Sequence, residues 1–516
     1  MDPFALEEQR LAKRRRIFVL VIVGVVILFL LNWLSGFSFI EVTVSGQGSG
    51  DLEYSILDQK QPDKRTVINT STTTVKKLAR KGNFEVIVRQ SDRTAFAVAS
   101  AKGFFRTTKI NLELQKERGR EFIGNNPSPC MTMLKQVLVS YACGGPYSDT
   151  IRHIPASGNQ ATYNLLAASG REGLIEGFVH MNGQDFVVLK NIIETSEQNP
   201  SHAVYPVGDD LSLPLIGTAL SGLNSNDIYS IVPFRQGFLA HNTTLTHFAY
   251  FSSIDGEPEI IQIERPEDQT LEPYLIAASG ETIAVAYAKP LERGRVDLDD
   301  PKTAARTPST ITLRTGNNVK QLMFNKRYGS MQICGADRLC MLSGKLLEVY
   351  DVSGKKPAKL FEVTNVSEIL YTGKLLLVIK DEGVVGLNTS TASGSMQYTF
   401  GQHTYCGIGL SGDDYLLCVI NPKQKKAALL VSQNKESDGI DQKIAGLLQL
   451  GEIRDISVYK NAIFISPNAG EMSFQPSLGG YDYNPDVVAS VSDRIDAKVD
   501  ELGIDRNKYR VVNTLR

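Results

Sequence analysis

The sequence predicts a mostly β protein that one N-terminal helix holds in a membrane. Three observations lead to this fold class: an uncharged apolar run near the N-terminus, short apolar stretches separated by turn residues along most of the chain, and an internal repeat. The 516 residues are 42% hydrophobic, which is enough for several domains. The formal net charge of −1 gives no sign of nucleic-acid binding.

The run from Ile17 to Phe37 is predicted to be a transmembrane helix that contacts the lipid bilayer. It carries no charge, and at a rise of about 1.5 Å per residue it matches a hydrocarbon core of about 30 Å. Residues 1–16 hold the basic cluster RLAKRRR, and no Lys or Arg follows Phe37 until Lys60. The positive-inside rule predicts a cytoplasmic tail at 1–16 and a single-pass cell-membrane protein with its bulk extracytoplasmic. A cleaved signal peptide, the alternative, would have a shorter apolar region and a small-residue cleavage site.

Six cysteines form three local pairs, each placed around a predicted tight turn. We expect the two members of each pair to lie opposite each other in an antiparallel hairpin and to form a disulfide in an oxidising exterior. Neither the C-x(2–4)-C spacing of zinc sites nor a redox C-x-x-C is present, so no catalytic, cofactor or metal site is predicted here. The pairs are Cys130 with Cys143, Cys334 with Cys340, and Cys406 with Cys418.

Residues 38–117 are predicted to form a small antiparallel β-sandwich. Short strands such as FIEVTVS, LEYSILD, FEVIVRQ, TAFAVAS and TKINLEL alternate with turns such as GQGSGD. Gly82 and Phe84 match a glycine–aromatic strand start, and Gly103 and Phe104 match a glycine–aromatic turn before a final alternating strand. These residues resemble the closing half of a PEGA-type surface domain, although its N-terminal P-x-G-A is missing. The resemblance implies a β-sandwich exposed at the cell surface.

Residues 127–475 contain an internal repeat of a strand, a tight polar turn and a strongly apolar strand. Eight copies have turns near residues 135, 183, 236, 280, 337, 373, 413 and 460. Because a four-stranded blade takes about 40–50 residues, we expect an eight-bladed β-propeller. Seven blades are the alternative, if the last copy completes the first blade and REFIGN (Arg120–Asn125) closes the ring. The repeat resembles WD-repeat and quinoprotein-type propellers without the signature motif of either.

The C-terminal segment 484–503 is predicted to be an amphipathic helix. Asn484 and Pro485 form a typical helix start, and Gly503 is a typical stop. The helix either packs on the side of the propeller or docks a partner. One apolar face is formed by Val488, Val491, Ile495, Val499 and Leu502.

Three short motifs were weighed as chemical sites. GIGLSG (407–412) precedes a strand rather than a helix, so a dinucleotide site is not predicted. His241 and His247 would lie about 20 Å apart on an extended strand, so they share a metal only if NTT turns the chain. The aspartates of VDLDDPK, namely Asp297, Asp299 and Asp300, indicate a solvated loop more readily than a calcium site.

With no catalytic constellation present, we expect a binding or scaffold protein for an envelope or cell-surface protein or glycan. Two long inserts, residues 191–214 and 289–309, are the expected contact loops. The alternative is an extracytoplasmic enzyme that acts on glycans or peptides, with Asp413 and Asp414 as candidate carboxylates. A transmembrane sensor is a third possibility, if the membrane helix contacts another subunit.

Overall fold

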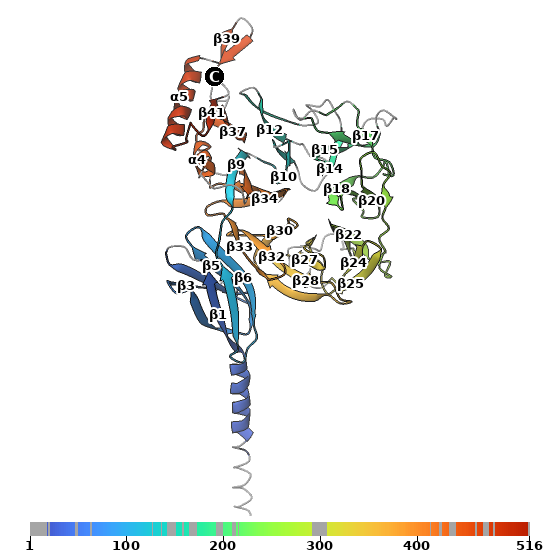
Figure 1. Ribbon diagram of the computed structural model, residues 1–516, viewed down its shortest axis with the longest axis vertical. Coiled ribbons are helices and arrows are strands. Elements are labelled where there is room, and N and C mark those ends of the chain that lie inside the picture. The colour runs from blue at the N-terminus through green and yellow to red at the C-terminus, as the bar shows by residue number, and fades with distance from the viewer. Residues whose placement is uncertain are drawn as a thin grey trace, which may run out of the picture. The chain divides into compact units, whose positions relative to one another are not determined.

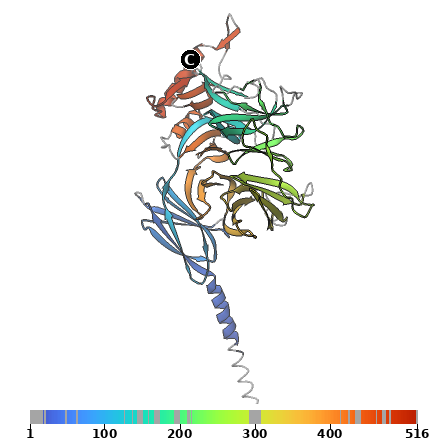
Figure 2. The same ribbon diagram turned by 45° about the vertical axis from the view of Figure 1, so that its right-hand side comes forward.

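The computed structural model describes most of the chain. The described residues are 18, 21–46, 50–61, 64–125, 127–135, 137–141, 151–156, 159–164, 173–191, 200–208, 213–214, 216–290, 307–412, 414–422, 426–432, 440–459, 462–467, 474–477, 480–483 and 485–513. They divide into two compact units (Figures 1 and 2). The first comprises Met1–Glu117 with the later segments Phe361–Thr364 and Ser390–Met396, and the second comprises the rest.

The N-terminal helix is described over residues 21–35, and its large apolar side chains are exposed. Within the described part of the chain, no helix is both long enough and apolar enough to cross a membrane. The predicted span Ile17–Phe37 falls partly outside the described residues, and the predicted tail 1–16 lies wholly outside them. Phe37 begins the first strand, so the helix ends before the residue that the sequence suggested.

The first unit is a sandwich of two sheets around one apolar core. One sheet has the order β4-β1-β7, in which β1 runs antiparallel to β4 and parallel to β7; the other contains β3-β2-β5-β6, with β8 beside β6. The core includes Ile40, Val42, Tyr54, Val86 and Val88, all fully buried. The strands are β1(Phe37–Ser45), β2(Leu52–Asp58), β3(Arg65–Thr70), β4(Thr74–Arg80), β5(Gly82–Gln90), β6(Arg93–Ala101), β7(Thr107–Glu113) and β8(Gln115–Lys116).

Two segments from later in the chain belong to this unit through specific contacts. The buried carboxylate of Glu85 accepts hydrogen bonds from the backbone nitrogen of Thr364 (2.6 Å) and from its hydroxyl (2.9 Å). Ser393 pairs with Ala97 of β6 as an added strand. The first unit therefore includes chain that lies almost 300 residues downstream of its own strands.

The second unit is a β-propeller built from four-stranded antiparallel sheets, which Figure 1 shows as a ring. Among the described residues there are seven such blades. The first three are β10(Cys130–Leu134) to β13(Asn159–Asn164) with β11(Val137–Tyr141) and β12(Ile151–Ala156); β14(Gly173–Met181), β15(Gln184–Asn191), β16(His202–Pro206) and β17(Thr218–Ala219); and β18(Tyr229–Phe234), β19(Gly237–Asn242), β20(Phe248–Phe251) and β21(Glu259–Ile260).

The next three blades follow the same order along the chain. They are β22(Glu272–Ser279), β23(Thr282–Ala288), β24(Ser309–Thr315) and β25(Asn318–Phe324); β26(Ser330–Ile333), β27(Arg338–Ser343), β28(Leu346–Asp351) and β29(Ala358–Val363); and β30(Val366–Tyr371), β31(Leu376–Lys380), β32(Gly383–Asn388) and β33(Ser393–Thr399).

The seventh blade closes the ring with a strand from the start of the propeller. β34(Thr404–Ser411), β35(Asp414–Ile420) and β36(Lys426–Ser432) pair in order, and β9(Gly119–Asn125) supplies the fourth strand beside β36. The REFIGN segment therefore closes the ring, as the seven-bladed alternative predicted. The leading count of eight blades is wrong, because the copy near residue 460 lies outside the ring.

That eighth copy extends the seventh blade instead. β37(Ile453–Tyr459) and β38(Ala462–Pro467) form the predicted hairpin and continue the sheet beyond β9, and β41(Arg510–Asn513) adds to β38 in parallel. α4(Ile440–Leu447) and α5(Pro485–Glu501) accompany this extension, with a small hairpin of β39(Phe474–Ser477) and β40(Gly480–Tyr483).

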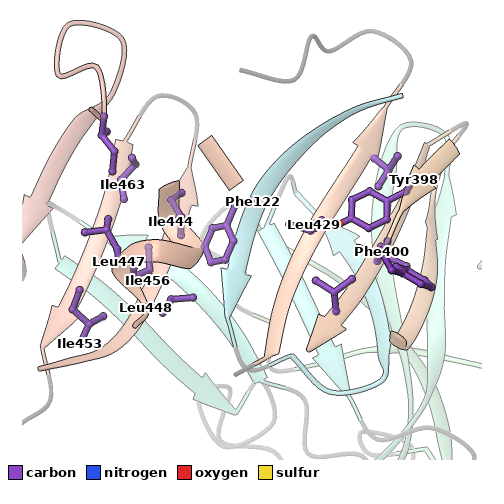
Figure 3. Close-up of a cluster of buried hydrophobic side chains, with 14 of the residues drawn as sticks. Phe122, Tyr398, Phe400, Leu429, Ile444, Leu447, Leu448, Ile453, Ile456 and Ile463 are labelled. Carbon is purple, nitrogen blue, oxygen red and sulfur yellow. The ribbon is translucent and has the colours of Figure 1, made fainter. Parts of the chain in front are cut away.

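The apolar face of α5 is buried against this extended sheet. Val491, Ile495 and Val499 are at most 2% exposed and share a core with Ile444 and Ile456, part of which is shown in Figure 3. Gly503 has a φ of 63° and donates its nitrogen to the carbonyl of Asp500, which ends the helix as the sequence indicated. The packing interpretation of this helix fits these contacts, because the apolar face is already covered.

The first strands of four blades share an irregularity at one position. β14, β22, β30, β34 and also β37 carry a register shift about six residues before their hairpin turn. An extra residue at such a bulge redirects its side chain and bends the strand. The common bulge shows that the β37–β38 hairpin resembles the first hairpin of a blade. The bulged residue is Glu176 in β14, Tyr274 in β22 and Cys406 in β34.

Candidate binding groove on the fourth blade

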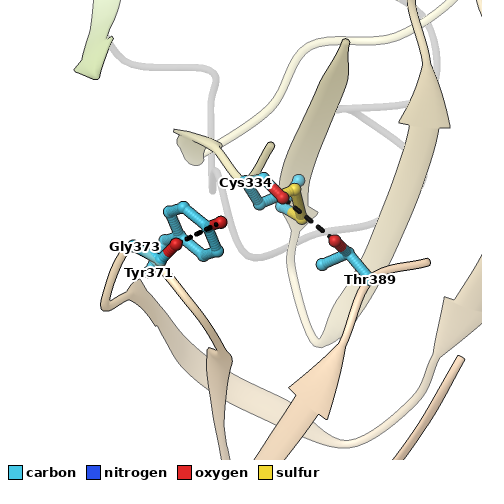
Figure 4. The surroundings of a disulfide bond; sticks show 5 residues. Cys334, Tyr371, Gly373 and Thr389 are labelled. Carbon is cyan, nitrogen blue, oxygen red and sulfur yellow. Dashed lines mark hydrogen bonds between the residues drawn. A yellow bond between two sulfur atoms is a disulfide. The ribbon is translucent and has the colours of Figure 1, made fainter. Parts of the chain in front are cut away.

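The structure confirms two of the predicted disulfides. Cys334 is bonded to Cys340 and Cys406 to Cys418, with Cα–Cα distances of 5.9 and 5.1 Å. Cys130 is also disulfide-bonded, whereas Cys143, its predicted partner, lies outside the described residues. Figure 4 shows the surroundings of Cys334, whose backbone carbonyl accepts a hydrogen bond of 3.0 Å from the Thr389 hydroxyl of the next blade.

The prediction that paired cysteines lie directly opposite each other is wrong in both confirmed hairpins. Cys340 faces Gln332, and Cys334 lies just beyond β26, because the loop is centred one residue earlier than expected. Cys406 is the bulged residue of β34, so Cys418 pairs with Gly407 instead. In each case the diagonal or bulged placement still brings the Cα atoms within the range that a disulfide spans.

GIGLSG forms the end of β34 and a turn that leads into the strand β35, so a strand follows the glycines as the sequence indicated. Its first two glycines serve close packing. A Cβ atom on Gly407 would clash with the carbonyl oxygen of Pro129, and one on Gly409 with that of Met131. These glycines allow β34 to approach β10 where the first and seventh blades meet.

The chain does turn between His241 and His247. β19 ends at Asn242, whose nitrogen donates to the carbonyl of His247, so the extended geometry considered from sequence does not apply. His247 Nδ1 lies 2.8 Å from the hydroxyl of Tyr229, and burial lowers the pKa of His241 below its ordinary value. In the described residues, no group of three or more metal-ligating side chains is assembled.

The structure describes one of the two carboxylates considered as enzymatic candidates. Asp413 lies outside the described part of the chain, and so do Asp297, Asp299 and Asp300, the aspartates considered for calcium. Asp414 begins β35, and its carboxylate lies 4.0 Å from the guanidinium of Arg118.

The two predicted contact inserts have different structures. The first, 191–214, contains β16, a buried strand of the second blade, so this part is scaffold rather than a free loop. Of the second insert, residues 291–306 lie outside the described residues, but both described flanks line a groove of about 750 Å³. The groove is lined by Pro266, Glu267, Asp268, Leu271, Lys289, Pro290, Thr307, Pro308, Ser309, Thr310, Gln321 and Met323.

The groove floor is formed by the outer strands of the fourth blade. Thr310 on β24 pairs with both Tyr287 and Met323, so these three side chains share one face of the sheet. Tyr287 is buried in the core between the third and fourth blades. Further out on the same face, Met323 is 78% exposed. The shared core therefore ends before the outermost strand and leaves an apolar side chain open to solvent.

The connection from the third blade to the fourth forms the opposite wall. Arg314 donates to the carbonyl of Gln262 at 2.6 Å, and Gln321 donates to that of Arg265 at 3.2 Å. These two bonds tie the segment that carries Pro266 and Leu271 to β24 and β25. The wall is thus positioned by side chains of the blade itself.

Charges of both signs lie at the rim. The hydroxyl of Thr270 donates to the carboxylate of Asp268 at 2.6 Å and lowers the pKa of that carboxyl, with smaller help from the Thr270 nitrogen and from Lys289. Asp268 is therefore ionised at neutral pH, and the rim presents it beside Lys289 and Glu267. An apolar floor with a few charged groups at the edge is the usual composition of a recognition site.

The sequence pointed to the insert but missed the groove floor. Met323 lies in the strand NVKQLMF between Leu322 and Phe324, which are both buried, so from sequence the methionine resembles an ordinary core residue. Its exposure follows from its position in the outermost strand of a blade, which becomes evident only when the four strands are ordered.

No protein-family model matches the chain, and no curated protein matches its sequence. Among solved structures, the chain is similar to BBS1N crystallised in complex with ARL6DN, at 10% identity and a TM-score of 0.34 over 61% of this chain and 94% of that chain. It is also similar to the N-terminal domain of Nup159, at 7% identity and a TM-score of 0.30 over 61% of this chain and 96% of that one. The propeller assignment rests on the strand pairing described above, and the PEGA resemblance stays a prediction.

Proposed function

We propose that this protein is a membrane-anchored binding protein whose propeller holds a protein partner at the envelope or cell surface. The groove on the fourth blade is the observation that carries this proposal. It exposes an apolar side chain, Met323, beside charged groups and next to the second insert, residues 289–309. Methionine adapts its shape to a partner, and such an apolar floor favours an apolar side chain from a protein over a glycan.

Membrane anchoring is supported by the uncharged run Ile17–Phe37 and by the exposure of its described side chains. Phe29 is 71% and Leu28 68% exposed on a helix that the rest of its unit leaves uncovered. A run of exposed Val, Ile, Leu and Phe is unfavourable in water at about 25 cal/mol per Å², so a lipid environment suits it. The basic cluster before it gives the orientation with the propeller outside.

Site-specific cross-linking of the full-length chain tests the binding role. A photoreactive residue replaces Met323 in one protein and, in the control, Ile216, an apolar side chain of the second blade that is 67% exposed. Both are irradiated in membranes of the source cell and the adducts are identified by mass spectrometry. We expect one stoichiometric protein adduct at position 323 that is absent at 216.

A charge substitution then asks whether that adduct reflects binding. Met323→Glu buries a carboxylate at the contact and should weaken the interaction about tenfold or more, whereas Ile216→Glu should leave it unchanged. Identical adducts at both positions, or equal affinity of Met323→Glu and unsubstituted protein, would remove the groove from the binding role. A released and altered glycan or peptide would favour an enzyme instead.

A further inference from the structure

Aromatic side chains gather where the N-terminal helix joins the sandwich. Trp33 contacts Phe37 with ring centroids 5.0 Å apart, and Phe37 stacks with Phe105 at 6.4 Å. Phe104, which precedes Phe105 on the same loop, is 73% exposed. Burial of a phenylalanine stabilises a fold, so a loop that holds one in water gives up that stabilisation.

The loop that carries Phe104 is held against the end of the helix by its backbone. The nitrogen of Phe104 donates to the carbonyl of Ser35 at 3.0 Å, and that of Phe105 donates to the carbonyl of Phe37 at 2.8 Å. Phe104 and Phe105 have φ values of 55° and 53°, a left-handed conformation that is costly for aromatic residues. Strain of this kind persists mainly where it serves a function, and here it fixes an exposed ring at the helix end.

The same end of the sandwich is basic. Phe37 pairs with Arg80, Gly82 with Ala101, and Leu57 with Arg65, so the β2–β3, β4–β5 and β6–β7 connections all lie beside the helix end. In the described residues 58–61, 64–65, 80–82 and 101–106, Asp58 is the only acidic residue. The exposed basic residues of this end are Lys60, Lys64, Arg65, Arg80, Lys81, Lys102 and Arg106.

Three of these lysines line one shallow pocket. Lys60, Lys81 and Lys102 surround it with the polar side chains of Asn83 and Ser100, in a volume of about 650 Å³. The nearby acids are already engaged within the unit: Asp58 accepts a hydrogen bond from the Lys60 nitrogen at 3.0 Å, and Glu362 accepts one from Asn83 at 3.0 Å. The pocket is therefore suited to an anionic oxygen ligand such as a phosphodiester.

We propose that this basic end binds anionic lipid headgroups, with the lysine pocket on a headgroup phosphate and Phe104 inserted at the membrane interface. Aromatic rings favour that depth, and lysine and arginine side chains near an anionic surface add electrostatic attraction. The inference rests on the proposed membrane anchor, because only an anchored helix brings its end to the interface. It adds a second, lipid-selective contact that fixes the first unit on the surface.

Tryptophan quenching in nanodiscs tests the insertion of Phe104 with the full-length chain. Trp33 is the sole tryptophan and therefore the only indole reporter of the chain. The double variant Trp33→Phe with Phe104→Trp moves this reporter to position 104. The control variant, Trp33→Phe with Ser71→Trp, places it just after the far end of β3. Lipids brominated near the headgroup should quench the unsubstituted protein and the position-104 reporter to a similar degree, and should leave the position-71 reporter bright. A bright reporter at position 104 beside a quenched Trp33 would overturn the insertion while leaving the anchor intact. An unquenched Trp33 would mean that the anchor itself fails.

Lipid selectivity is measured with the same reporter at position 104. At equal mole fraction, a headgroup-labelled anionic lipid should quench it more than a zwitterionic lipid that carries the same label. Replacing Lys60, Lys81 and Lys102 together with glutamine should lower the ratio of anionic to zwitterionic quenching toward one, whereas the same replacement of Lys76, Lys109 and Lys116 should leave the ratio unchanged. Equal quenching by the anionic and the zwitterionic lipid in the protein without lysine substitutions would overturn headgroup selectivity.

Discussion

The carboxylate of Glu176 accepts a hydrogen bond of 2.8 Å from the backbone nitrogen of Tyr229, across the boundary between the second and third blades. Glu176 is the bulged residue of β14, and Tyr229 is the first residue of β18. The same carboxylate lies 3.0 Å from Nδ1 of His202, and both side chains are fully buried. Tyr274, the bulged residue of β22, makes the corresponding contact: its hydroxyl accepts from the nitrogen of Tyr328 before β26.

Replacing Glu176 with alanine should therefore separate two blades. The change leaves the Tyr229 nitrogen and the His202 ring without their buried acceptor, and loss of one member of a buried pair costs about 3–5 kcal/mol. Urea unfolding followed by circular dichroism measures the loss, and hydrogen exchange should rise in β14 and β18. Glu281→Ala, in an exposed turn, should change the free energy of unfolding by less than about 0.5 kcal/mol. Equal exchange in the two variants would contradict the role of Glu176.

Each confirmed disulfide should stabilise one hairpin. Cys334→Ala with Cys340→Ala, and Cys406→Ala with Cys418→Ala, should each lower the free energy of unfolding by about 2–3 kcal/mol, because the closed loops are short. Local exchange should increase in β26–β27 for the first pair and in β34–β35 for the second. Unchanged melting of both variants under oxidising conditions would show that the bonds add no stability.

Gly407→Ala should weaken the contact between the first and seventh blades. A Cβ atom there meets the carbonyl of Pro129 closer than real contacts allow, so β34 and β10 must separate, at a cost of about 1–3 kcal/mol. Gly329→Ala is the matched control, since the nearest atom to its added methyl is 3.9 Å away. The melting temperatures of the two variants provide the measurement. An equal decrease in both would point to a general effect of losing a glycine rather than to this contact.

His241 should make stability depend on pH. Burial is the main cause of its lowered pKa, so the unfolded chain binds a proton near pH 6.5 that the folded chain does not. The free energy of unfolding should then fall as pH drops below 6.5 and stop responding to this group below its lowered pKa. His241→Gln should flatten this part of the profile, measured by urea unfolding between about pH 7.5 and 5. If the free energies of unfolding of the two proteins change with pH in parallel, His241 is not the cause of the pH dependence.

Local patterns predicted the hairpins of the propeller, because each consists of neighbouring strands joined by a tight turn. All eight expected hairpins are present, from β10–β11 to β37–β38. The blade count depends on β9, whose partner Lys426–Ser432 lies about 300 residues away, and no local pattern reports such a pairing. The strands β3 and β4 went unrecognised because RTVINT and TVKKLAR are largely exposed and polar.

The candidate groove was only partly predictable for a related reason. Pro290 and Thr307 belong to the insert that the sequence singled out, but Pro266 and Leu271 reach the groove from the connection between blades. Likewise, the bulge at Glu176 has no sequence signature, since the corresponding residue of β22 is a tyrosine and that of β34 a cysteine. A bulge is set by pairing on both sides and by what the neighbouring blade offers as a partner.

The closing strand β9 also sets an order of events during synthesis. It leaves the ribosome about 300 residues before β36, which at about 5–20 residues per second is an interval of about 15–60 s. Phe122 and Ile123, both buried in the finished ring, spend that interval on an unpaired edge that invites aggregation. Nascent chains of this protein therefore require protection of one short segment until the seventh blade emerges, and a chain that terminates before β36 leaves that segment permanently exposed to proteolysis.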